Sequence, residues 1–98
     1  MVSKIICWSP RALGDLHDVA AYIGKSSPIA AERFCSRVIE RVESAAEFPK
    51  TGRIVPEKNR ESLRELILAP FRIAYEVLSE RLVEIMMVWH SARRPNHF

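Results

Sequence analysis

The sequence predicts an α+β fold with an N-terminal strand, an antiparallel helical hairpin and then a three-stranded antiparallel meander. Two observations predict it: apolar residues recur at helical spacing up to Phe48, and at strand spacing in the C-terminal third. The chain has 98 residues, which is close to the commonest size for one domain and too few for two independent cores. We therefore expect a single domain over residues 1–98.

Both predicted helices begin at a Ser-Pro pair. A hydroxyl N-cap followed by proline at the first helical position is typical of a helix start, and Ser9-Pro10 and Ser27-Pro28 both have it. The first apolar stripe stops at Gly24, and the second continues for about 20 residues to Phe48-Pro49. Because a short connection separates the helices, we expect them to be antiparallel.

Four segments are predicted as strands, and the polar stretch Lys50–Ser62 is predicted as a connection. The strands are Lys4–Ser9, Leu63–Ala69, Phe71–Leu78 and Leu82–His90. Pro70 and Ser79-Glu80-Arg81 provide the turns of the meander.

The three-residue loop 79–81 predicts how the last two strands pair. The expected pairs are Leu78 with Leu82, Tyr75 with Ile85, Ile73 with Met87, and Phe71 with Trp89. This register gathers the bulky apolar side chains on the face that the helices cover, so the aromatic rings are not available to stack on bases. Arg72 and His90 are then expected side by side on the opposite, open face.

Composition excludes several classes of protein. No apolar run reaches the roughly 18–20 residues that span a bilayer, and no signal peptide is evident, so we expect a cytoplasmic protein. Cys7 and Cys35 form no CxxC pair, and the three histidines lie far apart. We therefore expect no metal site and no cofactor.

Charge is unevenly distributed along the chain. Residues 1–49 carry six Lys/Arg and six Asp/Glu, whereas residues 50–98 carry nine Lys/Arg against six Glu. The whole net charge of +3 therefore belongs to the second half. Its last stretch, residues 91–98, contains Arg93-Arg94 and no acidic residue. A basic bias of this kind suits an anionic partner, although solvated surface charge explains it equally well.

Glu57, Arg72 and His90 are the candidates for chemistry. Arg72 has a permanently charged fork that suits a phosphate, and His90 exchanges a proton near neutral pH. With Glu57 on a nearby loop, the three residues match the base, acid and cation that cleave RNA through its 2′-hydroxyl. Each also has a structural interpretation: Arg72 neutralises Glu76 or Glu84, His90 is a hydrogen-bonded strand end, and Glu57 is solvated.

A set of short motifs runs along nearly the whole chain. The motifs are Trp8-Ser9-Pro10, Asp15-Leu16, Ala30-Ala31-Glu32-Arg33-Phe34, Phe48-Pro49-Lys50-Thr51-Gly52-Arg53, Val55-Pro56-Glu57, Arg64-Glu65, Phe71-Arg72-Ile73-Ala74-Tyr75 and Val88-Trp89-His90-Ser91-Ala92-Arg93. In order and spacing this set resembles the RelE/ParE superfamily, the toxic halves of bacterial type II toxin–antitoxin modules, also called plasmid stabilisation proteins.

This resemblance implies the strand–helix–helix–three-strand fold and an antitoxin partner that covers the toxin in a hetero-oligomer. It also implies one of two activities: RelE-like members cleave mRNA on the ribosome, and ParE-like members poison DNA gyrase. Glu57, Arg72 and His90 would be catalytic in the RelE-like case. Ser91 stands where many of those nucleases have a terminal tyrosine, and the RNA-gripping lysines are few.

The ParE-like activity is therefore favoured, and it makes the protein a non-enzyme. In that case Arg72, His90, Arg93 and Arg94 are the residues expected to bind the target. The mRNA endoribonuclease, which would act with the ribosome and mRNA, remains the alternative. A detoxified relative that only binds its partner is a third hypothesis.

Overall fold

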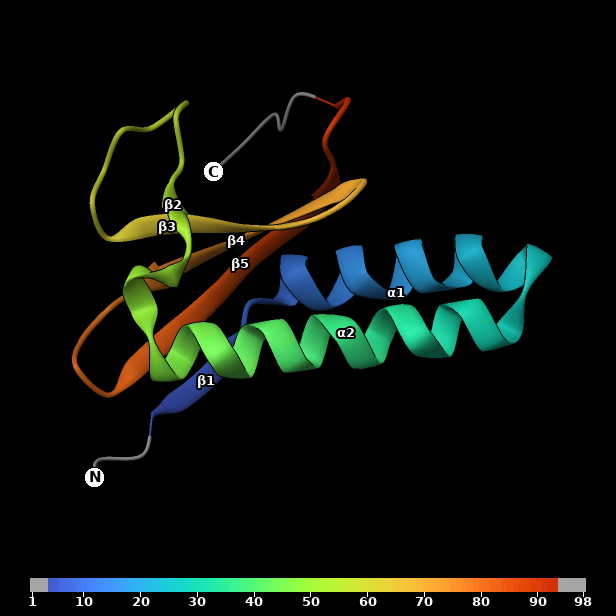
Figure 1. Cartoon of the computed structure of the whole chain (residues 1–98), viewed down its shortest axis with the longest axis horizontal. Helices are drawn as coiled ribbons and strands as arrows, with labels where there is room; N and C mark the ends of the chain where they lie inside the picture. The colour runs from blue at the N-terminus through green and yellow to red at the C-terminus, as the bar shows by residue number, and fades with distance from the viewer. Residues whose placement is uncertain (1–3, 94–98) are drawn as a thin grey trace.

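The computed structural model describes residues 4–93. Its elements in chain order are β1 (Ile5–Trp8), α1 (Pro10–Ser26), α2 (Pro28–Glu47), a 3-10 helix η1 (Pro49–Thr51), β2 (Arg53–Ile54), β3 (Leu63–Leu68), β4 (Phe71–Val77) and β5 (Leu82–His90). The helices lie side by side on one face of the sheet, and their connected end extends past it (Figure 1). The predicted α+β fold is confirmed. Within residues 4–93, no helix is long and apolar enough to cross a membrane.

The five strands form one mixed sheet in the order β1-β5-β4-β3-β2. β1 pairs with β5 in parallel, and the remaining pairs are antiparallel. The connection predicted over Lys50–Ser62 is wrong in part, because Arg53 and Ile54 form β2 and pair with Glu65 and Arg64. A strand of two residues is too short for side-chain alternation to reveal it.

The two serine caps are confirmed. The Ser9 hydroxyl accepts a hydrogen bond from the Ala12 amide at 3.0 Å, and the Ser27 hydroxyl accepts one from the Ala30 amide at 3.1 Å. The predicted stop at Gly24 is wrong, because α1 continues to Ser26. Ser27 ends α1 and caps α2 with one extended conformation, so the start of the second helix determines where the first one ends.

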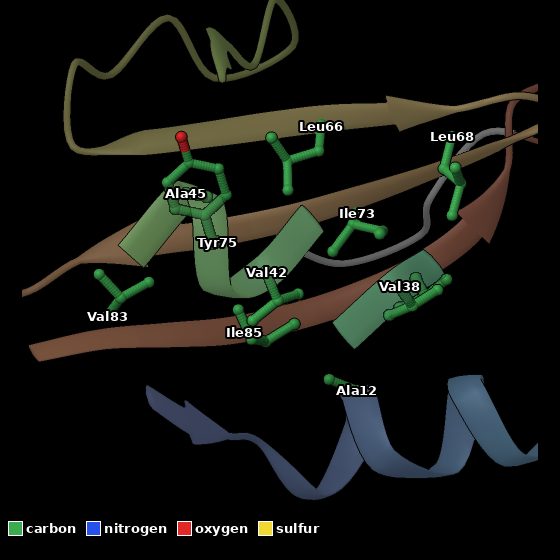
Figure 2. Close-up of a cluster of buried hydrophobic side chains, with 11 residues drawn as sticks. Ala12, Val38, Val42, Ala45, Leu66, Leu68, Ile73, Tyr75, Val83 and Ile85 are labelled. Carbon is green, nitrogen blue, oxygen red and sulfur yellow. The ribbon is translucent and has the colours of Figure 1, made fainter. Parts of the chain in front are cut away.

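The main core lies between the helical hairpin and the sheet. Figure 2 shows Val38, Val42 and Ala45 of α2 and Ala12 of α1 facing apolar side chains of the strands. The strand residues of this cluster are Leu66, Leu68, Ile73, Tyr75, Val83, Ile85 and Val88. A second, smaller buried cluster contains Ala74, Met87 and Trp89. It belongs to the other side of the sheet, which we call the open face.

The predicted register of β4 and β5 is confirmed near the hairpin loop and wrong beyond it. Tyr75 pairs with Ile85 as expected, but Ala74 pairs with Met87 because the register shifts between them. Met86 is therefore an extra residue in β5, a β-bulge, which inverts side-chain alternation for the rest of the strand. The last pairs are Ile73 with Val88, Arg72 with Trp89, and Phe71 with His90.

Gly52 allows the segment between α2 and β2 to pass close to the sheet. Its amide donates a hydrogen bond to the Tyr75 hydroxyl at 2.9 Å, and that hydroxyl donates to the Pro49 carbonyl at 2.6 Å. Tyr75 is fully buried, and burial raises the pKa of its hydroxyl group. One buried phenol thus joins η1 to the centre of the sheet.

We expect Gly52→Ala to destabilise the fold by about 1–3 kcal/mol because of steric overlap in a packed core. An added Cβ would lie 2.7 Å from the Glu65 carbonyl oxygen and would also overlap the Tyr75 hydroxyl. The free energy of unfolding in urea measures the effect. Gly14→Ala is the control: its Cβ meets nothing within 4 Å, and alanine favours a helix by about 1 kcal/mol. Equal stability of the two variants would contradict this prediction.

Candidate functional site

Arg72 lies in β4 on the open face, as predicted. Its neighbour Ile73 belongs to the helix-facing core, and alternation along the strand directs Arg72 to the other side. Trp89 lies opposite it on β5, and the guanidinium carbon is 4.6 Å from the centre of a Trp89 ring. Only 8% of Arg72 is exposed. A permanent charge buried to this extent requires acidic partners.

Two glutamates provide the partners of Arg72. Glu65 of β3 accepts a hydrogen bond from Arg72 Nε at 2.8 Å, and Arg72 NH2 also bonds the same carboxylate oxygen. Glu57, on the loop between β2 and β3, accepts bonds from Arg72 NH2 at 3.1 Å and from NH1 at 3.3 Å. The prediction that Glu57 reaches the open face is confirmed. Carboxylates therefore engage both ends of the guanidinium fork.

A second arginine completes the cluster. Arg53 of β2 donates from Nε to Glu65 Oε1 at 2.5 Å, so Glu65 is held by one arginine on each side. Glu65 is 1% exposed, whereas the side chain of Glu57 is 40% exposed. The four residues, which we call the open-face ion cluster, are Arg53, Glu57, Glu65 and Arg72. Their formal charges cancel.

The cluster changes the acidity of its members. Hydrogen bonds from Arg72 lower the pKa of Glu57 below its ordinary value, against the opposing effect of partial burial. Burial alone would lower the pKa of Arg72, but bonds to Glu57 and Glu65 outweigh it and raise the pKa. Glu57 is therefore an ionised acceptor at neutral pH, and a general acid requires the opposite shift.

His90 does not join this cluster. It pairs with Phe71, whose ring packs against Phe34 of α2, and the His90 ring centre lies 5.5 Å from that of Phe71. The prediction that His90 shares a face with Arg72 is wrong, because the Met86 bulge turns His90 toward the helix side. His90 Nδ1 accepts a hydrogen bond from the Ala92 amide at 3.0 Å, which fits the structural interpretation of a bonded strand end.

Two other expectations are also corrected, the first of them by the same bulge. Trp89 does not face the helices, and it packs over Arg72 in the second buried cluster. Arg72 does not neutralise Glu76 or Glu84; Glu76 bonds the side chains of Arg60 and Ser62. The sequence therefore points to the right face of the sheet for Arg72 and to one of its acidic partners, Glu57, but not to the other, Glu65.

Arg93 and Arg94, which we call the basic tail, follow β5 in the sequence. Arg93 is exposed, and its amide donates to the His90 carbonyl at 2.9 Å. Ser91 fastens the start of the turn, since its amide and its hydroxyl both donate to the Pro70 carbonyl at 2.8 Å. Arg94 lies outside the described residues. The predicted target-binding residues thus divide between the open face (Arg72) and the end of β5.

Sequence reasoning missed Arg53 and Glu65. The turn at Ala69-Pro70 pairs Ile67 with Arg72 and Glu65 with Ala74, so Glu65 is the diagonal neighbour of Arg72 on one face. Extending the hairpin register to β3 would have found Glu65. Arg53 had no comparable pattern, because β2 is only two residues long.

The matched relatives define a class, that of toxins. The chain is 36% identical over 88 residues to Toxin RelE2 of Caulobacter vibrioides, covering 90% of this chain and 96% of that protein. It is 42% identical over 93 residues to the protein Y4kP of Sinorhizobium fredii, covering 93% and 92%. A chain in the solved structure of the chromosomal ParDE TA system from P. aeruginosa shares the fold, with a TM-score of 0.69 at 22% identity, covering 92% of this chain and 96% of that one.

Within this class, residues 6–95 match the family model of the ParE toxin of type II toxin–antitoxin systems, parDE. The chain belongs to this ParE toxin family, within the RelE/ParE superfamily. Membership implies a cognate antitoxin as partner.

We expect the contribution of Glu57 to stability to disappear in acid. Its folded pKa is lowered from 4.5, so the ion pair with Arg72 stabilises the fold above that value and is lost as the pH falls through the folded pKa. Because Glu57 is partly exposed, Glu57→Gln should cost no more than about 1 kcal/mol at pH 7, and nothing in strong acid. Urea unfolding between pH 7 and pH 2 measures the difference.

Two further variants make this test specific. Glu80→Gln removes an exposed carboxylate from the β4–β5 loop, and as the charge-matched control it should cost less than about 0.5 kcal/mol at pH 7. Glu65→Gln removes the buried partner of two arginines and should cost about 3–5 kcal/mol at pH 7. If Glu57→Gln were as harmful as Glu65→Gln, the assignment of Glu65 as the central member of the cluster would be wrong.

Proposed function

We propose that this chain is a toxin that inhibits DNA gyrase and that its cognate antitoxin neutralises it. The resemblance assigns gyrase poisoning to ParE-like members, and the matching family model is that of a ParE toxin. One observation in the structure carries the choice: the residues of the nuclease hypothesis are not assembled. Arg72 is engaged by two carboxylates, and His90 lies on the other face.

The basic tail is the proposed contact with the target. The open-face ion cluster is neutral as a whole, and its members Glu65 and Arg72 are buried, so it offers little attraction for an anionic surface. Arg93 is exposed just after β5, and Arg94 follows it in the sequence. We propose that these two arginines engage gyrase, while Arg72 stabilises the sheet through its ion pairs.

The antitoxin is proposed to cover the helical hairpin and the sheet edges. Large apolar side chains are exposed there, and covering them with a partner would remove apolar area from water. They are Leu13 and Tyr22 of α1, Ile29 and Ile39 of α2, Ile5 of β1 and Ile54 of β2. β1 and β2 end the sheet, so each has one edge that can accept an added strand.

The direct test is gyrase supercoiling in vitro. Purified toxin at micromolar concentration should inhibit supercoiling, and an equimolar amount of the antitoxin encoded beside it should restore the activity. Relaxation by topoisomerase I is the control and should be unaffected. Gyrase that remains fully active at these concentrations would overturn the proposal.

A charge-matched pair of variants tests the tail. Replacing Arg93 and Arg94 by alanine should weaken gyrase inhibition about tenfold or more, since each charged contact contributes about 1.5–3 kcal/mol. Replacing Arg33 and Arg37, two exposed arginines of α2, removes the same charge and should leave inhibition unchanged. An equal loss in both double variants would indicate general charge attraction and not a tail contact.

The alternative is an endoribonuclease that cleaves mRNA on the ribosome. Glu57 and Arg72 lie together, but as an ion pair, so a phosphate would have to displace Glu57 before it reached the guanidinium. If a translation extract showed mRNA cleavage that Arg72→Ala or His90→Ala abolished, this function would replace gyrase inhibition. Harmless overexpression without the antitoxin would instead indicate a detoxified relative.

A further inference from the structure

The bulge in β5 lies where the strand loses its outer neighbour. β1 pairs with β5 only as far as Trp8 opposite Ile85, and the chain then turns into α1. Met86, the extra residue of the bulge, comes next in β5. The outer edge of β5 beyond Ile85 therefore needs hydrogen-bond partners other than a strand.

Residues of the β1–α1 corner and of α1 supply these partners. The Ser9 amide donates to the Ile85 carbonyl at 2.9 Å, and the Ser9 hydroxyl donates to the Met86 carbonyl at 2.9 Å. One turn into α1, Asp15 Oδ2 accepts a hydrogen bond from the Val88 amide at 3.0 Å. Ser9 and Asp15 thus bond the backbone on both sides of the bulge.

The apolar pattern of β5 does not itself select the bulged register. The segment after Ile85 reads Met86-Met87-Val88-Trp89, with apolar residues at even and odd positions. A continuous ladder would bury Met87 and Trp89 under the helices, and the bulged one buries Val88 there. Because both registers bury large apolar side chains, hydrophobic burial leaves the choice to other interactions.

We infer that Ser9 and Asp15 select the register of the last residues of β5, and that Asp15 is the decisive positioning residue. Its carboxylate is correctly placed for the Val88 amide only when Met86 is looped out. By holding that register, Asp15 places Trp89 over Arg72 and turns His90 toward Phe71. It thereby determines both the covering of the open-face ion cluster and the starting point of the basic tail.

The role of Asp15 can be tested by measuring which residues of β4 and β5 lie opposite each other in a variant. In Asp15→Ala, the nuclear Overhauser contact between the Arg72 side chain and the Trp89 ring should disappear and one between Arg72 and His90 should replace it. The Val88 amide should exchange with solvent about tenfold to a hundredfold faster, because it loses its acceptor. These readouts are structural, so they stand or fall independently of gyrase inhibition.

Two control variants separate this role from general helix stability. Asp15→Asn keeps a side-chain oxygen that can accept the Val88 bond and should retain the Arg72–Trp89 contact. Asp18→Ala removes an exposed carboxylate from the same helix and should leave it unchanged. If Asp15→Ala kept the Arg72–Trp89 contact and slow Val88 exchange, the bulge would be intrinsic to β5 and the inference would be wrong.

If Asp15→Ala does not fold, deleting Met86 provides a second test of whether Asp15 acts through the register of β5. Removing Met86 eliminates the extra residue, so an uninterrupted ladder then pairs Ala74 with Met87 and Arg72 with Trp89 without help from α1. Asp15→Ala in the Met86-deleted chain should therefore fold with the Arg72–Trp89 contact intact. Loss of the contact in that double variant would show that Asp15 acts through something other than register, which overturns the inference.

Discussion

The buried ion pair between Glu65 and Arg72 is the interaction on which the open face of the sheet depends. Neither charge could remain there alone, because an unpaired charge at such burial costs several kcal/mol. The ion pair between Glu65 and Arg53 therefore holds the short strand β2 at the edge of the sheet. The ion pair between Arg72 and Glu57 likewise holds the loop that carries Glu57. Trp89 covers the guanidinium from β5.

This arrangement limits what chemistry the open face can perform. A phosphate-binding arginine needs free donors, whereas the Nε, NH1 and NH2 atoms of Arg72 all bond carboxylates here. An acid catalyst needs a raised pKa, whereas that of Glu57 is lowered. The nearest histidine along β5 faces the helices. The three residues that suggest a nuclease in the sequence thus become, in the fold, two members of a structural cluster and one strand end.

The fold could be predicted from the sequence, but the arrangement of residues at the candidate site could not, and the difference has a physical cause. Serine caps and helical spacing depend on near neighbours, so Ser9-Pro10 and Ser27-Pro28 located both helices to within about three residues. The register of β5 depends on Asp15, which is 73 residues away from the Val88 amide in the chain. No local pattern contains that bond. One looped-out residue, Met86, then exchanged the faces of Trp89 and His90.

The ion pairs also show which positive charges of the C-terminal half are neutralised by a nearby glutamate. Four arginines of this half each pair with a glutamate, and they are Arg53, Arg60, Arg64 and Arg72. They contribute little to the field that an approaching partner experiences, because paired charges of opposite sign cancel at a distance. The net charge of +3 must therefore arise from other positions, among which only the chain end places two arginines in succession, Arg93 and Arg94. Two arginines in succession attract an anionic partner more strongly than one isolated charge does, which is why the proposed target contact lies after β5 and not at Arg72.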